Sequence, residues 1–488
     1  MPEASQPQAV TMFTEDDKTP PGPTAPWSPF SRRQRVAILV IVGLSGMLSP
    51  LSSLMYTPAL PAIAASLGVS ISDVNLTITT YLIFQGITPS IWGSLSDVYG
   101  RRLIYLVTLL ITVGASIGLC LTESFAVVLV LRALHATGCS STRALGAGVI
   151  RDIASPDIRG GYVGFYSAGV TAGTAFGPVF GGILAQYTSW HGIFYFLLAL
   201  GVLNLFIVLL FFPETLHSMS GDRKLPKYLQ PPVPWLRITE DSLPAQQMGS
   251  KSKVDFLGPL RIMRDFDVIC TLVFTGVCYT VWQDSMVATS TIYASQYHLS
   301  ELEIGLTYMS NGVGSLVGNV VVGRILDYDY KKQALLSEAK GAETLVIEHA
   351  RLRSLSYAVP AFTICMLLFG WIVQSHTHIS ASIVVAFFVG WLDSSILSTY
   401  TTLMVDLFEN AASTSSASLN LVRCLLGAVG SSTIELMIRA MGVGWSFTTL
   451  SCIIIISTPL VWYQYRFGYK FRARRSERRL SASTGEAA

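Results

Sequence analysis

The ten residues GSLSDVYGRR, from Gly93 to Arg102, end one long apolar run and open another. The glycines allow a tight turn and a close approach between helices. Asp97 can accept hydrogen bonds from arginines or from the N-terminus of a neighbouring helix. The stretch therefore predicts a charged turn between two apolar helices.

Apolar runs of this kind recur along most of the 488 residues. Hydrophobic residues make up 51% of the chain and charged residues only 13%, whereas soluble proteins carry about 25% charged residues. Runs of about 18 or more apolar residues can cross a bilayer as helices. We therefore expect an all-α membrane protein with twelve spans, at residues 37–63, 72–95, 103–122, 124–150, 161–185, 192–212, 268–292, 303–325, 355–374, 380–404, 413–436 and 443–463.

The twelve spans fall into two groups of six, and Lys and Arg favour the cytoplasmic side of a membrane protein. The expected outer loops carry only Arg439, which places both termini and the central linker inside. The net charge of +3 then reflects contact with the inner membrane surface, and nothing indicates nucleic acid as a partner. The parts are a disordered cytoplasmic tail (1–35), a six-helix half (36–213), a cytoplasmic linker (214–266), a second six-helix half (267–465) and a basic cytoplasmic tail (466–488).

The two halves also repeat a motif. The stretch GRILDYDYKK (residues 323–332) closes span 8 as GSLSDVYGRR closes span 2. Aligned on their glycines, both read Gly-x-x-x-Asp followed by two cations. Such repeats are typical of transporters that rock around a central substrate site. The predicted gate residues are Gly93, Asp97, Gly100, Arg101 and Arg102 in the first half, and Gly323, Asp327 and Lys331 in the second.

At GSLSDVYGRR the sequence resembles the major facilitator superfamily, whose signature after the second span is Gly-x-Leu-x-Asp-x-x-Gly-Arg-Arg/Lys. The resemblance implies the major facilitator fold, with two pseudo-symmetric halves and this cluster as an inner gate latch. GTAFGPVFGG in span 5 matches an exporter pattern, with simple helix packing as the alternative. YTPALP, PETL and LNLVRCLLGA add a likeness to fungal twelve-span drug:H+ antiporters. The residues of the span 5 antiporter motif are Gly173, Gly177, Pro178, Gly181 and Gly182.

Span 4 contains two arginines, Arg132 and Arg143. Eleven residues of helix leave them about 20° apart on one face and about 16 Å apart along it. Because a buried cation costs a few kcal/mol, we expect both to face water, an acid or an anionic ligand. The resemblance implies proton coupling for Arg132, with His135 replacing the usual glutamine. STRALGAGVI around Arg143 is similar to the citrate-exporter branch, where this arginine is implicated in holding carboxylates.

A structural partner for a buried acid, or a side chain that snorkels to the interface, is the alternative for Arg143. Asp284 in span 7 and Asp393 in span 10 are the acids best placed to oppose span 4, with a fixed salt bridge to Arg132 as the alternative. Arg423 in span 11 is expected to brace helices rather than bind cargo, and Glu435 to pair with Arg439. The substrate-binding candidates are Arg143, Arg132, His135, Tyr56, Gln283 and Tyr400, and the proton-coupling candidates are Asp284, Asp393 and Arg132.

These features predict a secondary active transporter that exports a small organic anion against protons by alternating access. The cargo would be a di- or tricarboxylate such as citrate or itaconate, or an acidic secondary metabolite. A broad multidrug:H+ antiporter, a non-transporting nutrient sensor and anion uptake remain as alternatives. No enzyme motif, cofactor motif or metal spacing is present, and the seven cysteines offer no outer pair for a disulfide. We expect a monomer in the plasma membrane, with the vacuolar membrane as the alternative, whose partners are substrate, protons and lipid.

Overall fold

The computed structural model describes residues 30–216, 257–339, 347–408 and 412–485, which are almost entirely helical. Nine helical stretches in these ranges are long and apolar enough to cross a membrane. α3 (Ile71–Tyr99) and α12 (Glu301–Ala339) fall outside the nine but match predicted spans 2 and 8. α16 (Ala412–Gly485) holds spans 11 and 12, joined at Gly442, whose φ is 81°. Every predicted span therefore coincides with helix.

The first half has two broken spans. Span 1 divides after Leu54, where Pro58 and Pro61 begin new helical segments and cannot donate backbone hydrogen bonds. Span 4 divides at Ser140, whose hydroxyl group donates to the backbone oxygen of Ala136. The elements are α1 (Arg32–Leu54), η1 (Thr57–Ala59), α2 (Leu60–Leu67), α3, α4 (Arg101–Leu121), α5 (Phe125–Cys139), α6 (Ser141–Ile153), α7 (Pro156–Tyr187) and α8 (Trp190–Phe211).

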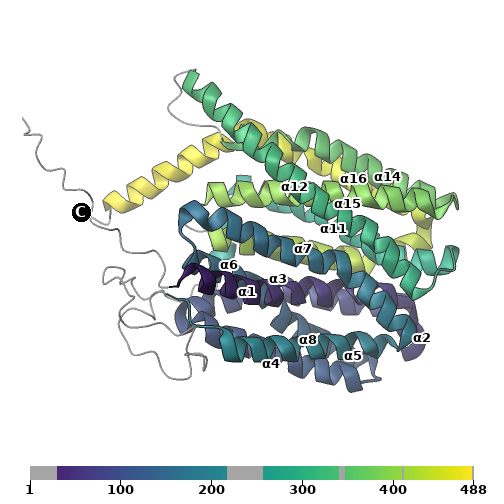
Figure 1. Cartoon of the computed structure of the whole chain (residues 1–488). Coiled ribbons are helices and arrows are strands. Elements are labelled where there is room, and N and C mark those ends of the chain that lie inside the picture. The colour runs from purple at the N-terminus through teal and green to yellow at the C-terminus, as the bar shows by residue number, and fades with distance from the viewer. Residues whose placement is uncertain (1–29, 217–256, 340–346, 409–411, 486–488) are drawn as a thin grey trace, which may run out of the picture.

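The second half lies beside the first, and the helices of the two halves run roughly parallel in Figure 1. α7 packs on α12 and α3 packs on α16, so these pairs join the halves. The elements of the second half are α10 (Gly258–Ile262), α11 (Phe266–Gln296), α12, α13 (Ile347–Leu352), α14 (Leu355–Gln374), α15 (Ile379–Leu407) and α16.

Glycines of the span 5 motif explain how closely α7 approaches its neighbours. Gly182 lies against the backbone of Glu301 in α12, and Gly181 against the backbone of Met55 after α1. A Cβ atom on Gly305 of α12 would lie 2.6 Å from the backbone oxygen of Pro178. The motif therefore lets α7 pack between α1 and α12, at the boundary of the two halves.

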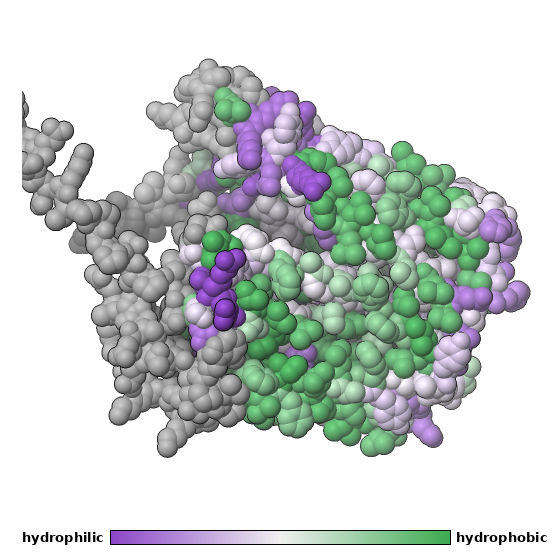
Figure 2. Space-filling view, in the orientation of Figure 1, coloured by the Kyte–Doolittle hydropathy of each residue, from purple (hydrophilic) through white to green (hydrophobic). Residues whose placement is uncertain are grey.

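The two ends of the bundle differ in charge. One end, which we call the basic end, carries the start of α1, with Arg32 and Arg33, and the last part of α16, and the opposite end carries α2 (Figure 1). Figure 2 shows a largely hydrophobic surface along the side of the bundle, with hydrophilic residues gathered toward its two ends. This belt has the character of a surface that faces lipid tails.

Candidate functional site between the two halves

Arg132 lies in a closed cluster inside the first half. Its guanidinium carbon is 4.4 Å from the ring centre of Tyr56 and 4.3 Å from that of Tyr81. Nη1 donates to the backbone oxygen of Ser52 at 3.2 Å, and the side chain is fully buried. Within the described residues Arg132 has no ion-pair partner, so the ring faces take the place of the salt bridge considered from the sequence.

His135 belongs to the same cluster. Its Nδ1 lies 2.9 Å from the hydroxyl oxygen of Ser52, and its Nε2 lies 3.6 Å from the sulfur of Cys139. Tyr56 accepts a hydrogen bond from the hydroxyl group of Thr77 and is fully buried. The structure thus brings three predicted substrate residues, Arg132, His135 and Tyr56, together within the helices of one half.

Arg143 has a different environment. It is only half-buried, and its guanidinium group interacts electrostatically with Arg423 and Tyr279 of the second half. The hydroxyl group of Tyr166 donates to its backbone oxygen at 3.0 Å. Because α6 packs on α16 and Arg143 interacts with Arg423 and Tyr279 there, Arg143 faces the second half. The expectation of one shared stripe with Arg132 therefore does not describe the two environments.

Arg423 presents a second cation at this boundary. Its guanidinium carbon lies 4.7 Å from the ring centre of Tyr279, and its Nη2 donates to the side-chain oxygen of Asn420 at 2.9 Å. Asn420 in turn donates to the backbone oxygen of Gln85 in α3 at 2.9 Å. Arg423 therefore braces helices as expected, but it also lies opposite Arg143. The signal for it was an arginine in the middle of an apolar span, the same signal that singled out Arg143.

The two candidate acids are separated by the fold. Asp393 of α15 is buried and interacts electrostatically with Arg423, beyond ion-pair distance. Asp284 of α11 packs against Gly430 of α16, where an added Cβ would lie 2.5 Å from a carboxylate oxygen. Both oxygens of Asp284 are buried without a hydrogen-bond partner in the described chain. Asp393 alone of the pair therefore lies beside the arginines of the boundary.

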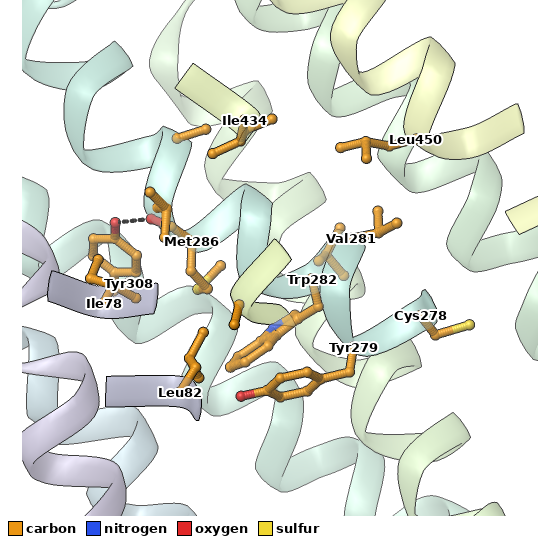
Figure 3. Close-up of a cluster of buried hydrophobic side chains, with 14 of the residues drawn as sticks. Ile78, Leu82, Cys278, Tyr279, Val281, Trp282, Met286, Tyr308, Ile434 and Leu450 are labelled. Atoms are coloured by element: carbon orange, nitrogen blue, oxygen red, sulfur yellow. Dashed lines mark hydrogen bonds between the residues drawn. The ribbon is translucent and has the colours of Figure 1, made fainter. Parts of the chain in front are cut away.

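Aromatic side chains of α11 complete the boundary site. The rings of Tyr279 and Trp282 lie 5.5 Å apart, and Figure 3 shows Leu82 of α3 close to both. Gln283 beside them is buried, with its side-chain nitrogen unpaired among the described residues. Tyr400 lies elsewhere, inside the second half and 5.8 Å from the ring of Phe274. Tyr279 thus joins Arg143 and Arg423, whereas Tyr400 does not.

The charged turn that opened the sequence forms a network at the basic end. Gly100 has a φ of 97°, which favours glycine and separates α3 from α4. Nε of Arg101 donates to Asp152 of α6 at 3.0 Å, and its guanidinium group also pairs with Asp97. The carboxylate of Glu214, in PETL, accepts from the backbone N–H groups of Arg101 and Arg102 at 2.8 and 3.1 Å. This network ties α3, α4, α6 and the end of α8 together.

The second half builds its counterpart from residues other than those predicted. α12 continues without a break through Gly323 to Ala339, so the turn expected there is absent, and Asp327 and Lys331 lie exposed on a helix. Arg351 instead pairs with Asp406 at 2.8 Å and donates to the backbone oxygen of Leu326. Arg351 precedes span 9 and Asp406 ends span 10, as Arg101 precedes span 3 and Asp152 ends span 4. In the described structure Arg351, rather than the Lys331 that the glycine alignment indicates, makes the ion pair at this place.

Two six-helix halves that meet at a charged central site are the architecture of a membrane transporter, not of an enzyme. Residues 42–431 match the Major Facilitator Superfamily, and the chain belongs to this family. It is 33% identical to Citrate exporter 1 of Aspergillus niger over 88% of this chain and 84% of that protein. It is 30% identical to the MFS antiporter QDR2 of Candida albicans over 82% of each chain.

Solved structures support the fold. The xylose transporter XylE of Escherichia coli, in a partially occluded inward-open conformation, superposes with a TM-score of 0.62 at 14% identity. The match covers 88% of this chain and 97% of XylE. The predicted all-helical major facilitator fold is therefore confirmed.

Proposed function

We propose that this transporter exports a small organic anion, a di- or tricarboxylate, held between Arg143 and Arg423. The observation that carries the proposal is the electrostatic interaction between two guanidinium groups from opposite halves, Arg143 on α6 and Arg423 beside the ring of Tyr279. Within the described residues neither arginine has a carboxylate at ion-pair distance. Guanidinium groups bind carboxylates in a matched, two-pronged geometry, and a ligand with two carboxylates can satisfy both at once. The likeness to the Aspergillus niger protein named a citrate exporter supports the same class of cargo.

Hydrogen bonds join the halves both at the α2 end and beside Arg423, where Asn420 donates to the backbone oxygen of Gln85. Toward the α2 end, the hydroxyl group of Ser290 donates to the backbone oxygen of Pro58, and the backbone N–H of Leu302 donates to Gln186. These bonds join the halves on the far side of the arginine pair. Because lysines and arginines favour the cytoplasm, the basic end faces inward in this proposal. The transporter then loads from the cytoplasm and exports across the plasma membrane as a monomer.

Proton coupling is assigned to Asp393 in this proposal. An ionised Asp393 stabilises Arg423 and competes with a bound anion for it. A protonated Asp393 leaves Arg423 free to bind the anion. Protonation of Asp393 and binding of the cargo are thereby linked through one arginine.

A second candidate is export of drug-like cations. The aromatic pair of Tyr279 and Trp282 beside the arginines favours it, because aromatic faces bind apolar and cationic ligands. The likeness to the QDR2 antiporter supports the same alternative.

Transport by the purified protein in liposomes tests the proposal. Radiolabelled citrate and a labelled hydrophobic amine are each offered with an imposed pH gradient, to the native protein, Arg143→Gln and Arg439→Gln. Arg439 is the control, because it pairs with Glu435 at 3.1 Å, as predicted, at the α2 end. We expect citrate transport that Arg143→Gln abolishes and Arg439→Gln leaves intact. Transport of the amine alone would overturn the anion proposal in favour of drug export.

A further inference from the structure

Residues 462–475 of α16 extend beyond span 12 at the basic end and have two different faces. We call them the terminal segment. Figure 1 shows it continuing as a helix past the ends of the neighbouring spans. Its sequence, WYQYRFGYKFRARR, combines aromatic residues with cations.

One face of the terminal segment is fixed to the second half by ion pairs. Arg475 pairs with Asp265 at 2.7 Å and with Asp267 at 2.8 Å, both at the start of α11. Arg472 pairs with the buried Glu348 of α13 at 3.6 Å. Gln464 donates to the hydroxyl oxygen of Thr271 in α11. These contacts hold the segment against the bundle and define which face is turned outward.

The contacts also set the depth of the terminal segment in the membrane. Asp265 and Asp267 flank the first residue of α11, where the polar chain meets the apolar span. Aromatic residues gather at the same level, with the ring of Tyr463 5.4 Å from that of Phe266. Tryptophan and tyrosine concentrate at the headgroup level of membranes. The terminal segment therefore lies at the headgroup layer beside the basic end.

The outward face carries three exposed cations at a spacing of four residues, Arg466, Lys470 and Arg474. Residues at this spacing share one helical face, and like charges there repel one another. In the described chain none of the three has an acidic partner. Trp462, Tyr465 and Tyr469 are 61%, 39% and 41% exposed on the same segment. An exposed row of cations among interfacial aromatic residues fits a surface of anionic headgroups.

We propose that the terminal segment binds anionic phospholipid in the leaflet at the basic end, through Arg466, Lys470 and Arg474. The face that is fixed by ion pairs holds the segment in place, and the outward face carries the cations that bind the lipid. An acidic protein would also meet three cations, but the aromatic residues and the depth of the segment favour lipid. This inference concerns lipid binding and does not depend on the cargo of the transporter.

Lipid retention by the full-length protein tests the proposal. The protein is reconstituted in nanodiscs that contain phosphatidylcholine and phosphatidylserine, and is then extracted and partly delipidated. The ratio of the two lipids that the protein retains is measured by mass spectrometry. The native protein should retain phosphatidylserine in preference. In Arg466→Gln/Lys470→Gln/Arg474→Gln the affinity for phosphatidylserine should fall by about fivefold for each cation removed.

A control triple variant, Arg324→Gln/Lys331→Gln/Lys332→Gln, removes the same charge from exposed positions of α12 at the same end. It should retain lipid as the native protein does. Arg475→Gln keeps the three cations but loses the ion pairs that hold the segment, and should also lose selectivity. Equal lipid ratios in the native protein and the terminal-segment triple variant would overturn the proposal. Equal losses in both triple variants would do so as well, because net charge alone would then explain the preference.

Discussion

The guanidinium groups of Arg143 and Arg423 repel each other across the boundary between the two halves. Arg143 comes from α6 and Arg423 from α16, so any rocking of one half against the other changes their separation. An anion between them removes the repulsion, and its departure restores it. The pair therefore links the occupancy of the site to the relative position of the halves.

Replacement of Arg423 tests the shared site. Arg423→Gln removes one charge-assisted interaction with the cargo, and such interactions contribute about 1.5–3 kcal/mol. The KM for citrate should therefore rise about tenfold or more. Arg423→Lys keeps the charge but loses the two-pronged geometry. Its KM for citrate should lie between that of the native protein and that of Arg423→Gln. Initial rates in liposomes measure this, and an unchanged KM in Arg423→Gln would remove this arginine from the site.

The basic-end network of the second half yields a prediction about which cation matters. Arg351→Glu should lower the apparent melting temperature and the transport rate, because it places two acids, Glu at 351 and Asp406, in contact. The swapped pair Arg351→Glu/Asp406→Arg should recover part of both losses. Lys331→Gln, at the cation chosen by the sequence repeat, should change neither. A larger effect of Lys331→Gln than of Arg351→Glu would make Lys331 the gate cation instead.

The fold was predictable because the length of an apolar run and the positions of the charged residues around it are local features of the sequence. The helices at the predicted spans could be read from runs of apolar residues, and the turn at Gly100 from its glycine and charges. The pair of Glu435 and Arg439 followed from helical spacing alone. Each of these features depends on residues close together in the chain.

The site was less predictable because it depends on contacts between distant segments. Arg132 and Arg143 lie in different environments although their spacing would align them on one helical face. Arg132 packs against Tyr56, Tyr81 and Ser52 of the first half, whereas α6 brings Arg143 to α16 of the second. Arg423 reaches the site through the packing of α16 on α3 and α11. Arg351 acts from a short helix, α13, that follows residues outside the described chain. None of these three placements follows from residues that are close together in the chain.

The close approach of α7 and α12 gives a prediction about conformation. Gly305→Val would place side-chain atoms against the backbone oxygen of Pro178 and force the two helices apart. The closed arrangement at the α2 end should become less populated. Ser290→Cys, introduced at a buried contact with Pro58, reports this as faster labelling by a membrane-impermeant thiol reagent. Gly164→Val, where an added Cβ meets open space, is the control on α7 and should leave the labelling rate unchanged.

Glu214 gives a prediction about pH. Burial raises the pKa of its carboxyl group, although backbone N–H groups of Leu216, Arg101 and Arg102 favour the ionised form. A pKa raised by folding contributes stability at acid pH, and this contribution is lost as the pH rises through the folded-state value. Glu214→Gln keeps an acceptor oxygen without the charge. The melting temperature of the native protein should therefore fall relative to Glu214→Gln as the pH rises.

Thermal unfolding of both proteins in the same detergent across acid to neutral pH measures this difference. Glu123→Gln, at an exposed loop residue, is the control and should follow the native protein. Glu214→Ala loses the acceptor and leaves buried N–H groups unpaired, which costs about 1–3 kcal/mol. It should be the least stable at every pH. A difference between the native protein and Glu214→Gln that grows toward acid pH would have the wrong sign for a buried carboxyl group.

Asp393 decides whether cargo and protons share one arginine. Asp393→Asn removes the acid beside Arg423 and leaves that arginine permanently available to the anion. Exchange of citrate for citrate across the membrane should persist, because it needs no proton, whereas a pH gradient should no longer drive net transport. Asp327→Asn, an exposed acid of α12, should leave both activities unchanged. If Asp393→Asn keeps full response to the gradient and Asp284→Asn loses it, the proton travels instead on the unpaired carboxylate of α11, and its coupling to cargo must pass through the packing of that helix against Gly430.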